Sequence, residues 1–556
     1  MPMQHRQSDV GAEPRRAAAL MRACVLLTLV AAVRMVYLRW FCPYSLVEDE
    51  AQYWVWSRHL AGAYATKGPG IAWCIRGATT LFSSEDEWTV RSVAAFCAWM
   101  TGIAVAWLSW EGARTVRACV LGAACCQLVP VFQAAGLLAT TDGPLLACWA
   151  WTALAVWKSV GADSRGKAMA WLALAGLALG AGTLCKHSML LIVPGVGWWC
   201  WRGGRARPPA GWVWVIAALI FAACMTPMVL WNARHGWPNV AHLLGHIGVG
   251  TTHVAAESTV SWIARVARSL GNLASFVGVT LLAGGPVVLL GMMEAWNIVR
   301  HADIGRAGPW GKLMVVCAAP ILLFYLAVSV VTPTEGNWAV AGFITLVPLA
   351  ARRIDRALGR TSRERNLARG LWNAGVIVGV VCAVVTLRLD LLARVPVVGR
   401  WIPVGRFIGA REMGANVSTL VDALRNETGK EPFVVAHHYG RAAQLWYEYG
   451  RHAGVPVYCS SSVIDEGRST PWDFWPEVSL RAPRRELLGR PAVAVGLQED
   501  VWQHVFTRVV RAPDDGLLAG DRKLVHNGAN NGRPSRPAFL VYDFRGIQPR
   551  TPRDDR

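Results

Sequence analysis

The final third of the chain is almost free of cysteine. Of the 14 cysteines in the 556 residues, only Cys459 lies beyond about residue 390. A disulfide framework needs several cysteines within one short module, so the sequence excludes a disulfide-stapled tail. The chain also lacks repeats of the helical-solenoid kind and any long low-complexity tract, which argues against a solenoid architecture.

Charged side chains are scarce as well. They make up 17% of the residues, against 54% hydrophobic residues and 29 tryptophans, and the mean hydropathy is positive. This composition is typical of membrane proteins and disfavours a soluble enzyme. The net charge of +20 could suggest nucleic acid, but the Lys and Arg residues form short clusters between apolar runs. We interpret these clusters as topology signals and expect no nucleic-acid partner.

About eleven segments approach the roughly 20 apolar residues that cross a bilayer. They lie near 17–38, 91–110, 118–138, 143–157, 168–185, 188–201, 211–231, 270–293, 313–331, 337–351 and 371–389. The first has a basic lead and resembles a secretory signal, but the many apolar segments that follow favour an uncleaved anchor. The expected fold class is a mainly α-helical polytopic membrane protein.

The positive-inside rule supports this count. If the N-terminus is cytoplasmic, every connection on that side is basic, and the opposite connections are poorer in Lys and Arg for their length. The basic residues are Arg114, Arg117, Lys158, Arg165, Lys167, Arg202, Arg205, Arg207, Arg300, Arg306, Lys312, Arg352, Arg353, Arg356, Arg360, Arg363, Arg365 and Arg369. The alternation predicts an odd number of spans, with residues 1–16 in the cytoplasm and the C-terminus outside.

The character of the chain changes near residue 391. The stretches PFVVAHH, PVYCS, PAVAVGL and AFLVYDF read as short strands, whereas GRAAQLWYEYGRH and EDVWQHVF read as helices. The stretch 461–490, rich in Pro, Arg and Ser, reads as loop. We therefore expect a membrane domain over 17–390 and a small extracytoplasmic α/β domain over 391–556.

Acidic, basic and imidazole side chains gather in the connections that should face outward. They are Glu48, Asp49, Glu50, Lys67, Asp142, Lys186, His187, His235, His242, His246, His253 and Glu335. This is the distribution expected of an active site at the outer membrane surface, built from loops that the spans hold together.

Each of these residues also has a structural interpretation. Asp49 and Glu50 could be first-turn carboxylates favoured by the dipole of an aromatic helix that lies in the membrane interface. Asp142 could be an N-cap, Lys67 an ordinary loop lysine, and Glu335 another cap. The histidines His242 and His246 are four residues apart and could share a helix face and bind a metal ion.

Several motifs together resemble a known family. They are DEAQYWVWSRHLAGAYATKGPGIAW, TTDGPLLACWAW, LGAGTLCKHSMLLIVPG, TPMVLWNARHGWPNV and TPTEGNWAVAG, in this order over roughly residues 20–350. In the tail, HHYGRAAQLWYEYG followed by WDFW adds to the likeness. The chain resembles the bacterial branch of the protein O-mannosyltransferase and aminoarabinose (lipid A) transferase group, the GT-C glycosyltransferases that use polyprenyl-phosphate-linked sugars.

The resemblance implies roles for individual residues. Asp49 matches the catalytic acid of the first outer loop, with Glu50 beside it, and Asp142 matches the acid of the second. Tyr64 and Lys67 match a Tyr-x-x-Lys segment whose lysine engages the lipid phosphate. The substrate-binding candidates also include His235, His246 and Glu335, and His246 with Ile247 resembles a His-Ile pair of the family.

The chain departs from the family at places that concern metal binding. An acid just before the lysine is replaced by Thr66, and an arginine after the His-Ile pair is replaced by the stretch 248–252. The usual paired prolines after the lysine are Gly68-Pro69 here. A divalent metal ion, with His242 and His246 as possible ligands, is therefore left open, as is the identity of the sugar.

The resemblance predicts a glycosyltransferase of a bacterial-type inner membrane. It would move a sugar, with inversion, from a polyprenyl-phosphate donor to a lipid, polysaccharide or protein acceptor, with Asp49 as the base. A polytopic transporter or lipid flippase is the alternative, and its acids and bases would lie near mid-span. A third interpretation is a membrane-anchored glycan-binding or sensor protein in which the tail does the work.

Overall fold

The computed structural model describes residues 12–202, 211–246, 261–300, 308–358, 363–395, 404–464, 469–481, 484–512 and 537–546. These residues form two compact units. The first unit contains the N-terminal helix, residues 67–74 and residues 91–386, and the second contains residues 42–66, 75–90 and the described residues from Leu387 on. The first outward connection thus contributes to both units.

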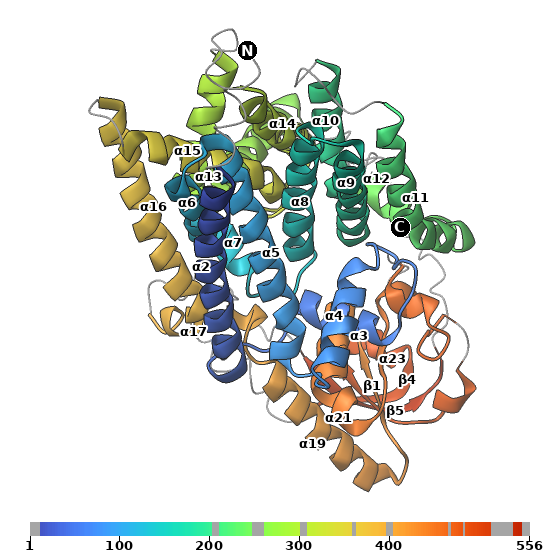
Figure 1. The fold of residues 1–556 in the computed structure, drawn as a ribbon. Helices are drawn as coiled ribbons and strands as arrows, with labels where there is room; N and C mark the ends of the chain where they lie inside the picture. The colour runs from blue at the N-terminus through green and yellow to red at the C-terminus, as the bar shows by residue number, and fades with distance from the viewer. Residues whose placement is uncertain are drawn as a thin grey trace, which may run out of the picture. The chain divides into compact units, whose positions relative to one another are not determined.

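The described part of the first unit is helical, and Figure 1 shows its long helices running alongside one another. The helices are α2 (Ala12–Trp40), α5 (Glu87–Ala113), α6 (Val116–Leu128), α7 (Pro130–Ala135), α8 (Asp142–Val160), α9 (Arg165–Cys185), α10 (Ile192–Trp201), α11 (Val213–Arg234), α12 (Pro238–His246), α13 (Trp262–Arg300), α14 (Gly308–Val331), α15 (Phe343–Leu358) and α16 (Arg363–Leu387). Short 3-10 helices, His187–Leu191 and Val340–Gly342, precede α10 and α15, and α4 (Gly70–Leu81) runs from the first unit into the second.

All eleven apolar segments expected from the sequence coincide with helices. In the part of the chain that the structure describes, seven helices are long and apolar enough to cross a membrane, namely α2, α5, α9, α11, α13, α14 and α16. The helices α6, α8, α10 and α15 are shorter or less apolar, and Pro130 divides the segment expected at 118–138 into α6 and α7. The polytopic helical fold class is confirmed, and the exact number of spans stays a prediction.

Tight helix packing holds the first unit together. A Cβ atom on Gly176 of α9 would lie 2.4 Å from the carbonyl oxygen of Ala217 in α11, and one on Gly291 of α13 would lie 2.3 Å from that of Leu346 in α15. Inside a membrane the hydrophobic effect does not drive helices together, so such close backbone contacts carry much of the packing. Large side chains fill the remaining core, and Trp149 of α8 is fully buried.

Buried carboxylates anchor the connections that the sequence assigns to the cytoplasmic side. Glu111 of α5 accepts hydrogen bonds from Arg114 at 2.7 Å and from Lys158 at 3.2 Å. Glu294 of α13 accepts one from Arg356 of α15 at 2.8 Å. The basic residues of these connections therefore fix helix ends.

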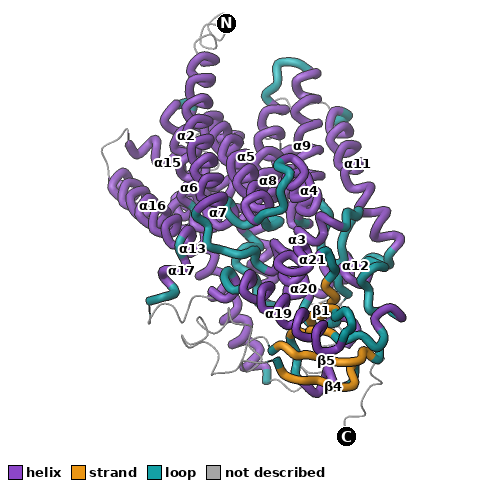
Figure 2. The backbone as a smooth tube through the Cα atoms, turned by 90° about the horizontal axis from the view of Figure 1, so that it is seen from below, coloured by secondary structure: helices purple, strands orange, loops and turns teal. Residues whose placement is uncertain are grey.

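The second unit contains a five-stranded sheet with the order β2-β1-β3-β5-β4. Its strands are β1 (Phe433–Ala436), β2 (Val457–Cys459), β3 (Ala492–Val495), β4 (Phe506–Arg511) and β5 (Ala538–Phe544), which Figure 2 shows gathered together in orange. The pairs β1–β2 and β1–β3 are parallel, whereas β3–β5 and β4–β5 are antiparallel.

The helices of the second unit include α3 (Glu48–Arg58) from the first outward connection. The others are α17 (Leu389–Leu392), α19 (Ala410–Thr428), α20 (Tyr439–Leu445), the π-helix Trp446–Gly450, α21 (Arg451–Ala453), α22 (Ser461–Ile464) and α23 (Glu499–Gln503), together with the short 3-10 helices Val404–Arg406, Pro471–Phe474 and Arg485–Leu487. The four expected strands and the α/β class of the tail agree with this structure.

Two elements of the tail differ from the sequence-based expectation. EDVWQHVF was expected to be helical throughout, but α23 ends at Gln503 and β4 begins at Phe506. The long amphipathic helix α19 was not anticipated, although it buries one face that includes Met413, Val417 and Val421. In both cases packing against the rest of the unit decides the conformation, since local propensity is only a weak prior.

Glu448 in the π-helix predicts a pH-dependent stability. Burial raises its pKa to about 7, with the charge of Glu87 adding to the effect. Because the folded protein holds this proton more tightly than the unfolded chain, its stability should fall as the pH rises from about 4.5 to 7 and then stay low. We expect Glu448→Gln to raise the free energy of unfolding by about 2 kcal/mol at pH 8 and to leave it nearly unchanged at pH 4.5.

Thermal unfolding of the purified protein at the two pH values measures this effect. Asp500→Asn, which removes an exposed carboxylate from α23 of the same unit, is the control and should change neither midpoint. An equal gain from Glu448→Gln at both pH values would contradict the titration of this group.

Candidate active site

Three consecutive carboxylates open α3, and each has a different environment. Glu50 is buried, and its Oε2 accepts a hydrogen bond from the backbone N–H of Val47 at 3.1 Å. Glu48 forms an ion pair with Arg441 of α20, with 2.6 Å between Oε1 and Nη2. Asp49 is exposed, and among the described residues no hydrogen bond or ion pair engages its carboxylate. Asp49 is thus the carboxylate of the three that is available for chemistry.

The geometry of Glu50 favours its structural interpretation. Its carboxylate reaches back to the residue that precedes the helix, which is how a side chain at the third helical position satisfies a free N–H group. A catalytic role for Glu50 stays a prediction. The sequence did not indicate that Glu50 would be buried and Asp49 exposed, because the two residues are adjacent and both lie in the first turn of α3.

The aromatic side chains of α3 contact protein. Tyr53, Trp54 and Trp56 are at most 3% exposed, and Trp54 packs edge-on against Tyr447 of the same unit, with ring centroids 5.0 Å apart. A helix resting in the membrane interface would present these rings to lipid. That expectation from the sequence was wrong, because the rings fill the core of the second unit.

Tyr64 is a packing residue in this structure. Its ring stacks on Trp56 with 4.2 Å between centroids, and its hydroxyl oxygen lies 2.8 Å from the carbonyl oxygen of Trp56 and 3.1 Å from that of His59. It is 2% exposed, and burial raises the pKa of its phenol. Its geometry supports a role in shaping the loop, and substrate binding by Tyr64 stays a prediction.

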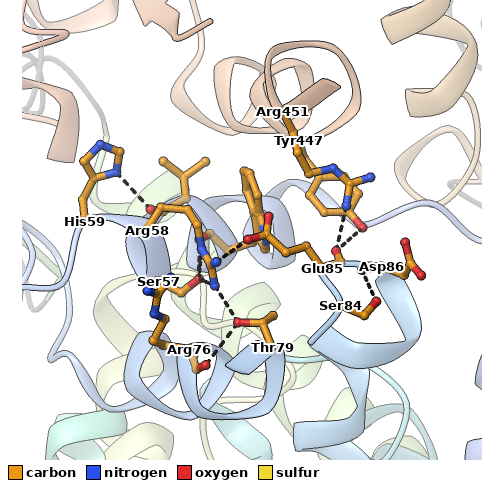
Figure 3. A network of polar contacts seen from close by, with 12 residues as sticks. Ser57, Arg58, His59, Arg76, Thr79, Ser84, Glu85, Asp86, Tyr447 and Arg451 are labelled. Carbon is orange, nitrogen blue, oxygen red and sulfur yellow. Dashed lines mark hydrogen bonds and ion pairs between the residues drawn. The ribbon is translucent and has the colours of Figure 1, made fainter. Parts of the chain in front are cut away.

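A polar network fixes the end of α3 (Figure 3). The guanidinium of Arg58 forms an ion pair with Glu85 and donates to the hydroxyl of Thr79 at 2.6 Å. The backbone carbonyl of Glu85 accepts further hydrogen bonds from Tyr447 at 2.9 Å and from Arg451 at 2.8 Å. The network joins residues far apart in the sequence. It connects α3, which carries Asp49, to residues 75–90, and it connects residues 75–90 to the tail.

A second polar cluster lies in the first unit, where three outward connections meet. The Oδ1 atom of Asp142 is 2.6 Å from Nζ of Lys186, and its Oδ2 accepts a hydrogen bond from the side-chain amide of Asn337 at 2.7 Å. Asp142 is 5% exposed. It is the first residue of α8, with Thr141 in the N-cap position, so the N-cap interpretation was wrong by one residue.

The segment that carries Lys67 packs against the same region. A Cβ atom on Gly68 would lie 2.1 Å from the carbonyl oxygen of Leu184, and one on Gly70 would lie 2.4 Å from Sγ of Cys185. The two contacted residues, Leu184 and Cys185, immediately precede Lys186 in the sequence. Only glycine allows the backbone to approach so closely. Four of the five outward connections expected from the sequence therefore meet in the first unit, and half-buried Lys67 adds a second lysine to this region.

Sequence reasoning only partly identified this cluster. Lys186 was among the polar residues pooled from the outward connections, and Asn337 was not a candidate. The signal that could have found them is positional, because both lie in connections on the same side as Asp142. A contact between residues 195 positions apart leaves no local pattern in one sequence.

His235 and Glu335 each have a local contact in what the structure describes. The Nδ1 atom of exposed His235 is 2.7 Å from the carbonyl oxygen of Trp231, and the two rings stack. Glu335 is exposed in a turn that its carbonyl closes with the N–H of Trp338. A role for His235 or Glu335 in substrate binding stays a prediction.

The metal question stays open on the residues described. His242 and His246 both belong to α12, but the side chain of His246 and all of His253 lie outside the described residues. Within those residues, no group of three or more His, Cys, Asp or Glu side chains could hold a metal ion.

The comparisons with known proteins agree with this architecture. Residues 66–231 match the profile of the family described as dolichyl-phosphate-mannose-protein mannosyltransferase. The lipid A galacturonosyltransferase RgtD of Rhizobium johnstonii is 25% identical over 442 residues, which cover 77% of this chain and 83% of that protein. An undecaprenyl phosphate-alpha-4-amino-4-deoxy-L-arabinose arabinosyl transferase of Enterobacter is 25% identical over 340 residues, 60% of this chain and 57% of that protein.

The fold is similar to that of a solved transferase. The structure of ArnT from Cupriavidus metallidurans bound to undecaprenyl phosphate aligns with a TM-score of 0.58 at 15% identity, over 93% of this chain and 97% of that one. Its apo state aligns with a TM-score of 0.55, over 86% and 93%. The matches support a membrane glycosyltransferase with the GT-C fold. They do not favour the transporter or flippase alternative.

Proposed function

We propose that this glycosyltransferase moves a sugar from a polyprenyl-phosphate-linked donor to a lipid A-type acceptor on the outer side of a bacterial inner membrane. The observation that carries the proposal is the contact of Asp142 with Lys186 and Asn337, which come from three outward connections of one unit. Gly68, the neighbour of Lys67 in the sequence, packs against Leu184 in the same unit. The two relatives suggest the substrate classes, since one is a lipid A galacturonosyltransferase and the other an undecaprenyl phosphate-alpha-4-amino-4-deoxy-L-arabinose arabinosyl transferase. A polysaccharide or protein acceptor is the alternative outcome of the experiment below.

The two lysines suit a phosphate. Asp142 neutralises Lys186 and orients it, and Asn337 holds the other carboxylate oxygen. Lys67 then supplies the positive charge for the phosphate that departs. A lysine about 4 Å from a phosphate contributes roughly 4 kcal/mol of Coulomb attraction at an effective dielectric constant of about 20.

Transfer is a single displacement in this proposal. An acceptor hydroxyl attacks the anomeric carbon as Asp49 takes up its proton, and the bond between that carbon and the phosphate oxygen breaks. The electron pair leaves with polyprenyl phosphate, whose new charge Lys67 stabilises. Attack opposite the leaving group inverts the anomeric configuration. Stabilising charge that develops during the reaction is often the largest contribution to catalysis.

Lys67→Met tests the phosphate contact. We expect kcat/KM for the lipid-linked donor to fall by about 10²–10³-fold, because a Coulomb contribution of roughly 4 kcal/mol is an upper bound on the loss. Lys167→Met is the matched control, since Lys167 is an exposed lysine that pairs with exposed Asp163 and such pairs contribute little. An unchanged kcat/KM in Lys67→Met would remove this lysine from the site.

The function itself is tested with membranes that contain the protein and radiolabelled polyprenyl-phosphate sugars. Label that moves into the lipid A fraction supports the proposal. Label in polysaccharide or protein would keep the transferase and change its acceptor. Donor that crosses the membrane without losing its sugar would restore the flippase interpretation.

A further inference from the structure

The helix α20 of the tail contacts the start of α3 at several atoms. Arg441 places Nη2 at 2.6 Å from Oε1 of Glu48 and Nη1 at 2.6 Å from Oε1 of Gln444. The side-chain amide of Gln444 in turn donates to the carbonyl oxygen of Leu46 at 2.9 Å. All these residues belong to the second unit. One arginine and one glutamine thus hold both the approach to α3 and its first residue.

Glycine and histidine complete this contact. A Cβ atom on Gly440 would lie 2.7 Å from Oε2 of Glu48, so a larger residue there would displace the glutamate. His438 caps α20 by accepting a hydrogen bond from the N–H of Gly440 at 3.2 Å, and its Nδ1 lies 3.5 Å from Oε2 of Glu48. The Arg441 side chain is 12% exposed, which makes this ion pair more protected from water than a surface pair.

The contact has an electrostatic consequence for Asp49. Among the described residues, the charged and titratable groups at this end of α3 include Glu48, Asp49, Glu50, Arg441 and His438. Without Arg441, the carboxylate of Glu48 would stand unneutralised beside Asp49, and a like charge nearby opposes ionisation. It would also be free to turn toward the acceptor. Arg441 therefore affects both the charge and the placement of its neighbour.

We propose that Arg441 is a positioning residue for sugar transfer, which acts by fixing and neutralising Glu48 so that Asp49 alone is presented to the acceptor. The inference rests on the proposed role of Asp49 as the base. It gives the tail a part in the reaction, because the residue that supports the first outward connection lies almost 400 positions later. The motif HHYGRAAQLW of the tail then has a mechanistic purpose.

The test compares Arg441→Ala with the double variant Glu48→Gln/Arg441→Ala in the full chain. We expect Arg441→Ala to lower kcat by about 10–100-fold with little change in KM for the donor, and to move the acid limb of the pH–rate profile to higher pH. Removing the orphaned charge with Glu48→Gln should return the acid limb to its original pH and restore most of kcat. A merely structural role for Arg441 would not predict either recovery.

Two further variants keep the result interpretable. Arg425→Ala, which removes an exposed arginine paired with Asp422 and Glu431 on the same unit, should leave kcat and the pH profile unchanged. In the Asp49→Asn background, Arg441→Ala should cause no further loss, because a residue that acts through Asp49 is not additive with it.

The outcomes separate this inference from the proposed function. If Arg441→Ala leaves kcat and the acid limb unchanged while Asp49→Asn abolishes transfer, only the positioning role is overturned. If Arg441→Ala loses kcat and Glu48→Gln recovers nothing, the electrostatic account is overturned. If Asp49→Asn transfers sugar normally, the failure belongs to the proposed base.

Discussion

Asp49→Asn is expected to lower kcat/KM for sugar transfer by about 10²–10⁴-fold, the range that a positioned general base contributes. The fold should be unaffected, because Asp49 is exposed and, among the described residues, its carboxylate engages no partner whose loss would cost stability. Asparagine keeps the size of the side chain and a first-turn helix position while removing the ability to take up a proton. The measurement is steady-state transfer by purified protein with a lipid-linked donor.

Neighbouring carboxylates provide the controls for Asp49. Glu50→Gln should retain most of kcat and lower stability by about 1 kcal/mol, because its carboxylate caps α3. Glu48→Gln should retain kcat as well, since its charge is already neutralised by Arg441. A loss in Glu50→Gln as large as that in Asp49→Asn would mean that the two carboxylates share the chemistry.

Lys186→Met is expected to cost about 3–5 kcal/mol of folding free energy and to abolish transfer. Asp142 is 5% exposed, and its ion pair with Lys186 is 2.6 Å long. Removing one partner of a buried pair leaves the other as an uncompensated charge, which is far more costly than losing the pair as a whole. Thermal denaturation of the purified protein and a transfer assay at low temperature measure the two effects separately.

The double variant Asp142→Asn/Lys186→Met distinguishes this account from simple loss of packing. With no charge left, it should recover most of the lost stability but none of the activity. Asn337→Ala should cost less than Lys186→Met, because Asn337 contributes one neutral donor to Oδ2 of Asp142. If the double variant were as unstable as Lys186→Met, the lost stability would come from altered packing around the substituted side chain, and the account based on an unpaired charge would be contradicted.

Much of the fold could be predicted because its signals are local. Apolar length alone located helices at all eleven expected segments. The side of the membrane on which each helix end lies stays a prediction. In the tail, short apolar runs located four of the five strands. The strand Phe506–Arg511 was missed because TRVVR carries two arginines and directly follows a run that reads as helix. Its pairing with β5 makes it a strand.

The candidate site could be predicted only as a set of connections. The expected position on one side of the membrane grouped Asp142 with Lys186, and the structure places these two side chains in contact. The ion pair of Glu48 could not be predicted, because its partner Arg441 is almost 400 residues away in the sequence. The burial of Trp54 could not be predicted for the same reason, since it packs against Tyr447 of the tail.

The measurement that tests the central claim most directly follows both products of a single reaction. Purified protein in liposomes is given a synthetic polyprenyl-phosphate sugar and a lipid A-type acceptor, and free polyprenyl phosphate and glycosylated acceptor are quantified by mass spectrometry. We expect the two to appear in equal amounts, with the acceptor required for release and with Asp49→Asn suppressing both. Release of polyprenyl phosphate without acceptor, or movement of intact donor across the bilayer with no release, would contradict the account.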